Sequence, residues 1–145
     1  MASARGRLTP VPLNRLRLAS AVLTVAWAAL IYYLSDQSRL DIPSIFTMQD
    51  KLLHLSAYAV LGFFALGTQQ TGASGYRVRD YWKIAALTAL YGVLDEFHQS
   101  FVPGRNADVL DVLADASGAL LGAGVLFLIV RKSCLARKNR GTMNI

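Results

Sequence analysis

The chain consists of long apolar stretches separated by short polar segments. A helix needs ~20 predominantly apolar residues to cross the ~30 Å hydrocarbon core of a bilayer. Four stretches carry no charge or almost none, and they cover residues 18–35, 52–76, 84–94 and 112–130. Three of them approach this length, and the third in order, 84–94, must be extended to reach it. Their number and spacing predict an all-α fold, a polytopic membrane four-helix bundle.

The third stretch is too short to cross a membrane by itself. It covers only residues 84–94. A helix of that length rises about 16 Å, roughly half the hydrocarbon thickness. A crossing helix must therefore include Tyr81 and Trp82 at one end and continue to Phe101 at the other. The polar residues of the segment DEFHQ, 95–99, are then predicted to lie in the outer turns of this helix, not in a loop.

Positive charge is concentrated at one predicted side of the membrane. Twelve of the fifteen Lys and Arg lie in three segments: Arg5, Arg7, Arg15, Arg17; Arg77, Arg79, Lys83; and Arg131, Lys132, Arg137, Lys138, Arg140. Among the acids, only Asp80 lies with them. This positive-inside bias predicts an N-in/C-in topology. We attribute the net charge of +6 to topology and contact with anionic membrane lipids, and exclude nucleic acid as a partner.

The same pattern divides the chain into three parts. We predict a basic, loosely ordered cytoplasmic tail at 1–17, a transmembrane domain at 18–130 and a basic cytoplasmic tail at 131–145. The apolar stretch at 18–35 is interpreted as a first span and not a cleaved signal, because it is long and no small-x-small site closes it. The single cysteine, Cys134, excludes an internal disulfide.

Polar residues recur at helical spacing on the predicted second and third spans. Asp50, His54 and Tyr58 are four residues apart and share one helix face. On the third span, the i, i+3, i+4 spacing places Asp95, His98 and Gln99 on one face, with Glu96 at least a quarter turn away. The outer connection between the first two spans, 36–49, shows no pattern that points to chemistry.

The fourth span carries a continuous stripe. Its members are separated by 3, 4, 3 and 4 residues: Asp108, Asp111, Asp115, Gly118 and Gly122. The inner half is a GxxxG, a spacing that lets two helix backbones approach closely. Because the glycines and the carboxylates share one face, we predict that both point into the bundle. Asn106 or Asp108 is predicted to cap the helix.

Topology brings these groups to one membrane face, and four hypotheses are open for them. They are general acid–base catalysis by His54 or His98 with a carboxylate; a metal site; a binding cleft in which Lys51 and Arg105 contact a phosphate or carboxylate; and a buried ion-pair network that locks the helices together. Ionisable residues inside a bilayer are costly, so we favour a functional role for the ensemble.

These residues resemble the VanZ-like family of small bacterial membrane proteins. The matching segments lie within 27–130: DKLLH at 50–54, YGVLDEFHQ at 91–99, FVPGR at 101–105 and DVLDVLAD at 108–115. Asn is frequent in the family where this chain has Asp115. The resemblance implies a helical integral membrane protein of the cell envelope, and its namesake is associated with resistance to the glycopeptide teicoplanin.

We therefore predict an inner-membrane, multi-pass protein whose site faces the extracytoplasmic side and binds or modifies a lipid-linked or peptidoglycan-related component, such as a cell-wall precursor or lipid head group. The alternative is a non-catalytic membrane subunit or small transporter. The sequence leaves open which cofactor or metal, if any, is bound and whether the site is enzymatic. The candidate catalytic residues are Asp95, Glu96, His98 and His54. The candidate binding or supporting residues are Asp50, Lys51, Tyr58, Gln99, Arg105, Asp108, Asp111 and Asp115.

Overall fold

The structure of the protein is a computed structural model, which describes residues 13–38, 45–72 and 74–142. Within these ranges the protein is all-α, with four helices and no strand: α1 (Leu13–Ser35), α2 (Gln49–Gly67), α3 (Val78–Gln99) and α4 (Val109–Thr142). The second and third helices, α2 and α3, lie where the pattern of polar and apolar residues predicted them. The extension of the short third stretch into the DEFHQ segment is confirmed, because α3 ends at Gln99.

The outer helices extend into both predicted tails. Helix α1 begins at Leu13, so residues 13–17 are helical, whereas residues 1–12 lie outside the described part of the chain. Arg17 belongs to the first turns of α1, and its Nε donates to the carbonyl oxygen of Thr68 at 3.0 Å. A long side chain can keep its charge at the polar end of a helix while its stem lies along apolar surface. The helix can therefore begin before the charged Arg17, and not after it as predicted.

Helix α4 continues past the predicted end of its apolar stretch, to Thr142. No Pro or Gly interrupts 131–140, and Lys, Arg, Leu and Ala are good helix formers. Basic side chains are also favourable near a helix C-terminus, where the macrodipole is negative. The described part of the predicted C-terminal tail, residues 131–142, is thus helical throughout.

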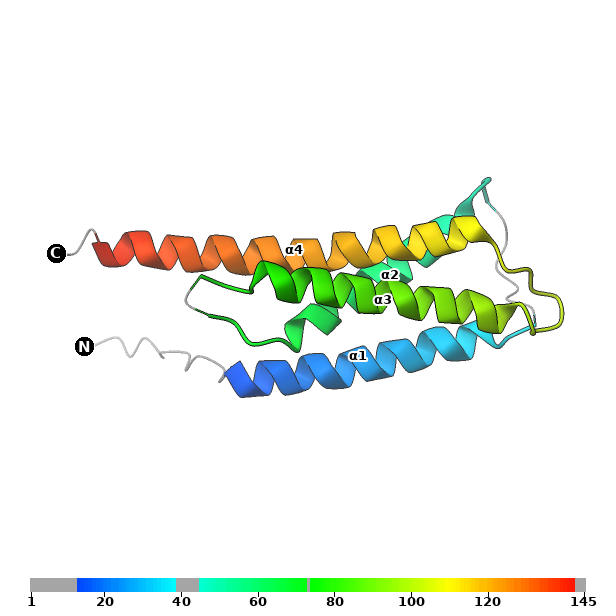
Figure 1. Ribbon diagram of the computed structural model, residues 1–145, viewed down its shortest axis with the longest axis horizontal. Helices are drawn as coiled ribbons and strands as arrows, with labels where there is room; N and C mark the ends of the chain where they lie inside the picture. The colour runs from blue at the N-terminus through cyan, green and yellow to red at the C-terminus, as the bar shows by residue number, and fades with distance from the viewer. Residues whose placement is uncertain (1–12, 39–44, 73, 143–145) are drawn as a thin grey trace, which may run out of the picture.

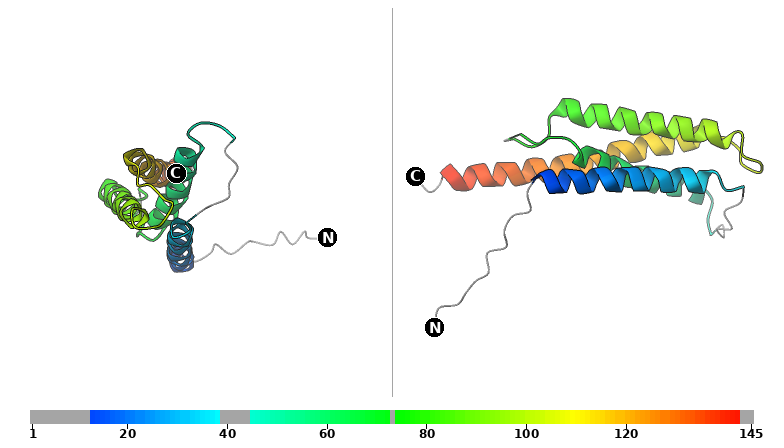
Figure 2. Two further views of the ribbon diagram at one scale, coloured as in Figure 1. Left: turned by 90° about the vertical axis from the view of Figure 1, so that its right-hand side faces the viewer. Right: turned by 90° about the horizontal axis from the view of Figure 1, so that it is seen from below.

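The helices run alternately up and down along one axis (Figure 1). The start of α1 and the end of α4 lie at the same end of the bundle, and the C-terminal part of α4 extends beyond its neighbours (Figure 1). The end-on view shows the four helices side by side, with α1 at one edge (Figure 2). The basic residues at the starts of α1 and α3 and at the end of α4 therefore share one end, opposite the described carboxylates other than Asp80.

Glycine and alanine allow α2 and α4 to pack closely. A Cβ added at Gly118 would overlap the carbonyl oxygen of Leu55, and one at Gly122 would overlap that of Ala59. In the opposite direction, a Cβ at Gly62 would lie 2.6 Å from the carbonyl oxygen of Ala119. The prediction that the GxxxG faces a neighbouring helix is confirmed, and that neighbour is α2.

The bundle buries several polar side chains beside its apolar core and exposes large apolar side chains on its outside. Among the described residues, seven polar or charged side chains are buried: Ser35, Thr88, Asp95, Glu96, Gln99, Asp111 and Asp115. Large aliphatic and aromatic side chains are exposed along all four helices. Two of the described helices, over Asn14–Ser35 and Val109–Arg140, are long and apolar enough to cross a membrane. Extensive exposed apolar surface of this kind is typical of a membrane protein.

Candidate functional site

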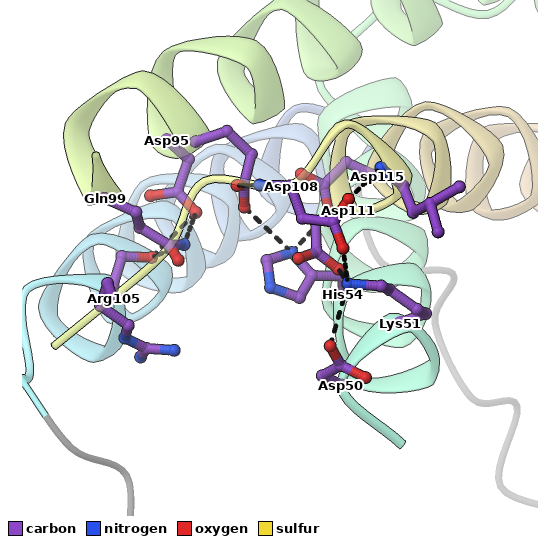
Figure 3. Close-up of polar contacts among 12 residues, drawn as sticks. Asp50, Lys51, His54, Asp95, Gln99, Arg105, Asp108, Asp111 and Asp115 are labelled. Carbon is purple, nitrogen blue, oxygen red and sulfur yellow. Dashed lines mark hydrogen bonds and ion pairs between the residues drawn. The ribbon is translucent and has the colours of Figure 1, made fainter. Parts of the chain in front are cut away.

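The first polar cluster joins the start of α2 to the start of α4. The ammonium Nζ of Lys51 lies 2.9 Å from Asp50, 2.5 Å from Asp108 and 2.9 Å from Asp111 (Figure 3). The contacts with Asp50 and Asp108 are hydrogen bonds, and the contact with Asp111 is an ionic one. The Lys51 ammonium also holds the pKa of the exposed Asp108 carboxyl below its ordinary value. Asp108 caps α4 as predicted, because its Oδ1 accepts from the N–H of Leu110 at 2.9 Å.

His54 lies one turn further along α2 and faces the buried carboxylates of α3 and α4. Its Nδ1 is 3.0 Å from Oδ1 of Asp115 and 3.8 Å from Oε1 of Glu96. Asp115 is fully buried. Glu96 points away from the other polar residues of α3, as the helical spacing predicted. Its Oε2 accepts a hydrogen bond from the backbone N–H of Asp108 at 3.0 Å. We call Lys51, His54, Glu96, Asp108, Asp111 and Asp115 the His54 cluster.

Gly92 on α3 makes room for the deepest carboxylate of this cluster. A Cβ built at Gly92 would lie 2.7 Å from the Cβ of Asp115 and 2.8 Å from its Oδ2. The absence of a side chain at position 92 therefore allows Asp115 to sit between α2 and α3. Nothing in the sequence marked this glycine, since its role depends on a residue of another helix.

A second polar cluster joins α3 to α1. Ser35 donates its hydroxyl to Oδ2 of Asp95 at 2.8 Å, and Nε2 of Gln99 lies 3.2 Å from both Oδ2 of Asp95 and Oγ of Ser35. All three residues are buried, and we call them the Asp95 cluster. Asp95 and Gln99 share a face, as predicted. Ser35 was missed, because it stands at the edge of a connection that showed no sign of chemistry and because its partners are distant in the sequence.

Two predicted site residues have other partners. His98 is separated from His54: its Nε2 lies 3.3 Å from Oδ1 of the exposed Asp36, and its ring packs against Tyr32 with centroids 4.8 Å apart. Arg105 donates to two backbone carbonyl groups at the end of α1, those of Leu34 at 2.9 Å and Gln37 at 3.1 Å. A metal site with both histidines as ligands does not fit this arrangement.

A groove of about 450 Å³ opens beside both clusters. Its wall is largely apolar, contributed by Ile31 and Leu34 of α1, Leu53 and Ala57 of α2, and the segment before α2. Its polar residues are Ser35, Thr47, Gln49, Asp50, His54, Tyr58, Asp95, Gln99 and Arg105. Asp50, His54 and Tyr58 all line the groove, which confirms that they share one face of α2.

These clusters lie in a region of the chain that matches a known protein family. The family described as VanZ/LLP1 matches residues 20–131, which include both polar clusters and parts of all four helices. The chain belongs to the VanZ/LLP1 family. Neither the curated proteins nor the solved structures contain a match. The VanZ/LLP1 region begins within α1 and ends within α4, shortly after the apolar part of that helix.

Proposed function

We propose that this VanZ/LLP1 protein binds an amphipathic component of the cell envelope, lipid-linked or peptidoglycan-related, in the groove between α1 and α2. The observation that carries the proposal is the composition of the groove. An apolar wall leads to a polar end that holds His54, Asp95 and Gln99. Binding sites for small molecules typically combine an apolar lining with a few convergent polar groups. Such a site accepts an acyl or prenyl chain along the wall and a head group at the polar end.

The chemistry of the polar end favours a head group rich in hydrogen-bond donors. Lys51 is engaged by three carboxylates, and Arg105 donates to backbone carbonyl groups. Lys51 is therefore not positioned to bind a phosphate directly, which was one of the four hypotheses from the sequence, and Arg105 has available only the N–H groups that its two backbone contacts do not use. Asp50 and Asp95 instead present acceptor oxygens. Hydroxyl, amide and ammonium groups of a sugar, peptide or aminated head group complement them.

In this proposal the four helices all cross the membrane, both termini are cytoplasmic and the groove opens to the extracytoplasmic side. The distribution of basic residues supports this orientation, because the starts of α1 and α3 and the end of α4 carry most of them. Helix α3 carries polar residues in its outer turns, which is compatible with a membrane span because Asp95, Glu96 and Gln99 are buried in the bundle.

The native cysteine provides a direct test of orientation. Cys134 on α4 is predicted to react with a membrane-impermeant maleimide only after the inner membrane of spheroplasts is permeabilised. A Ser38→Cys variant that also carries Cys134→Ser is expected to react without permeabilisation, because Ser38 is exposed at the opposite end. Labelling of Cys134 in sealed spheroplasts, with protection of the cysteine at position 38, would reverse the proposed topology.

A pair of neighbouring leucines tests the groove. Leu53 lines it and Leu52 does not, although both are about half exposed, at 47% and 53%. Leu53→Ser is expected to weaken binding of the amphiphile about tenfold, because the apolar contact of one leucine with a bound chain is worth at least ~1.4 kcal/mol. Leu52→Ser is expected to leave binding unchanged.

The measurement is native mass spectrometry of the purified full chain in detergent, titrated with phosphatidylethanolamine, phosphatidylglycerol and a prenyl-linked sugar–peptide precursor. The proposal expects one of these amphiphiles to be retained at one per chain and to be lost selectively in Leu53→Ser. Equal loss in both leucine variants, or retention of none of the three, would contradict it.

A further inference from the structure

We propose that His54, Glu96 and Asp111, supported by Asp115, form a binding site for one divalent transition-metal cation, Zn²⁺ or Mn²⁺. The proposal goes beyond the function given above and does not depend on whether the groove binds a lipid. Four observations carry it: the distances between the ligand atoms, the unpartnered buried oxygens, the charge balance and the donor types.

The three residues come from three helices and converge on one point. One ligand atom from each of His54, Glu96 and Asp111 lies within 4.8 Å of the other two. Atoms bound to one cation at ~2.1 Å are at most ~4.2 Å apart. The three groups therefore need only small shifts to share one ion. Figure 3 shows His54, Asp111 and Asp115 facing one another across the junction of α2 and α4.

Several carboxylate oxygens at this point have no hydrogen-bond partner. They are Oε1 of Glu96, Oδ1 of Asp111 and Oδ2 of Asp115, in residues that are 3%, 7% and 0% exposed. Oδ1 of Asp111 has an ionic contact with Lys51 at 2.9 Å, whereas neither of the other two oxygens is in such close contact with a basic group. Oε1 of Glu96 lies 3.8 Å from His54. Buried polar atoms are normally satisfied, and a bound cation would satisfy Oε1 of Glu96 and Oδ2 of Asp115.

The charges lead to the same conclusion. Three buried carboxylates, those of Glu96, Asp111 and Asp115, have only two basic groups near them, Lys51 and His54. Lys51 is also shared with the more exposed Asp50 and Asp108. Buried charges are stable when they are paired or coordinate a metal. A divalent cation neutralises two of these carboxylates without a further side chain. Protons shared among them are the alternative, and the experiment below separates the two.

The donor set narrows the choice of cation. One imidazole nitrogen and two or three carboxylate oxygens suit Zn²⁺, whose protein ligands are Cys, His, Asp and Glu. The predominance of carboxylate oxygens among these ligands also suits Mn²⁺. The imidazole makes Ca²⁺ and Mg²⁺ poorer matches, because both prefer oxygen-only ligands.

The full chain, purified in detergent and stripped with a chelator, is to be titrated with Zn²⁺ and with Mn²⁺. The bound metal is then measured by inductively coupled plasma mass spectrometry after desalting. We expect one equivalent of one of the two metals per chain, with an increase in thermal unfolding temperature in the same sample. The near-isosteric variants Glu96→Gln and Asp111→Asn are expected to weaken metal binding at least tenfold.

The exposed His98–Asp36 pair provides the matched control, since it also combines an imidazole with a carboxylate. His98→Ala is expected to retain the full metal content. Electron paramagnetic resonance of bound Mn²⁺, or the visible spectrum of a Co²⁺ substitute, reports ligation even where a variant is less stable. Absence of stoichiometric metal from the wild-type chain, or equal binding in wild type and Glu96→Gln, would overturn the proposal in favour of shared protons.

Discussion

Gly122→Ala is expected to destabilise the bundle by about 3 kcal/mol or more. The added methyl group overlaps the carbonyl oxygen of Ala59, and a backbone atom cannot rotate away as a side chain can. Helices α2 and α4 must therefore separate where they pack most closely. Overpacking of a core costs ~1–3 kcal/mol even where neighbouring side chains can adjust. The measurement is equilibrium unfolding of the purified chain in mixed micelles.

Gly124 on the same helix is the matched control. A Cβ there meets only the Tyr81 ring, at 3.8 Å or more, which is ordinary contact. Gly124→Ala is expected to be neutral or to stabilise the helix by up to ~1 kcal/mol, because alanine is the better helix former. If the two alanine variants were equally stable, the close packing of α2 on α4 would be refuted.

Lys51→Met is expected to cost ~3–5 kcal/mol in metal-free protein, the usual loss when one partner of a buried ion pair is removed. The substitution leaves the buried Asp111 without its ammonium partner, and an uncompensated buried charge is strongly destabilising. The Lys51 side chain is only 17% exposed, so solvent compensates little for the loss. Thermal unfolding in the presence of a chelator measures the effect.

A second substitution tests whether the cost comes from the unpaired charge. The double variant Lys51→Met, Asp111→Leu is expected to recover most of the lost stability, since an apolar pair of similar volume can replace a buried ion pair. If the single variant lost less than ~1 kcal/mol of unfolding free energy, the Lys51 contacts would be equivalent in energy to surface salt bridges, which contribute little to stability. That result would contradict the prediction.

The helical spacing of polar residues predicted much of the site. The stripe Asp108, Asp111 and Asp115 faces α2 together with its glycines, because residues three and four apart on a helix must share a face. The same rule placed Asp50 and His54 together, and it separated Glu96 from Asp95. These predictions needed only the helix period and the order of the spans.

Contacts between helices were not predictable in this way. Ser35 and Arg105 acquire their roles from atoms on other elements, far away in the sequence, and no spacing within one helix records such a partner. His98 illustrates the limit of the face argument. Neighbouring residues point ~100° apart on a helix, so His98 and Gln99 diverge to opposite sides of Asp95. One reaches the exposed Asp36, and the other reaches α1 through Ser35.

The length of α4 has a consequence for its basic end. The helix runs from Val109 to Thr142. A helix of that length rises about 51 Å, whereas the hydrocarbon core is only about 30 Å thick. With α4 upright in the proposed topology, the side chains of Arg131 and Lys132 lie at the head groups, whereas Arg140 stands about 12 Å further into the cytosol. At physiological ionic strength the Debye length is ~8 Å. The first two cations therefore attract anionic lipid, while the last turns of α4 form a salt-screened rod that lies clear of the membrane surface.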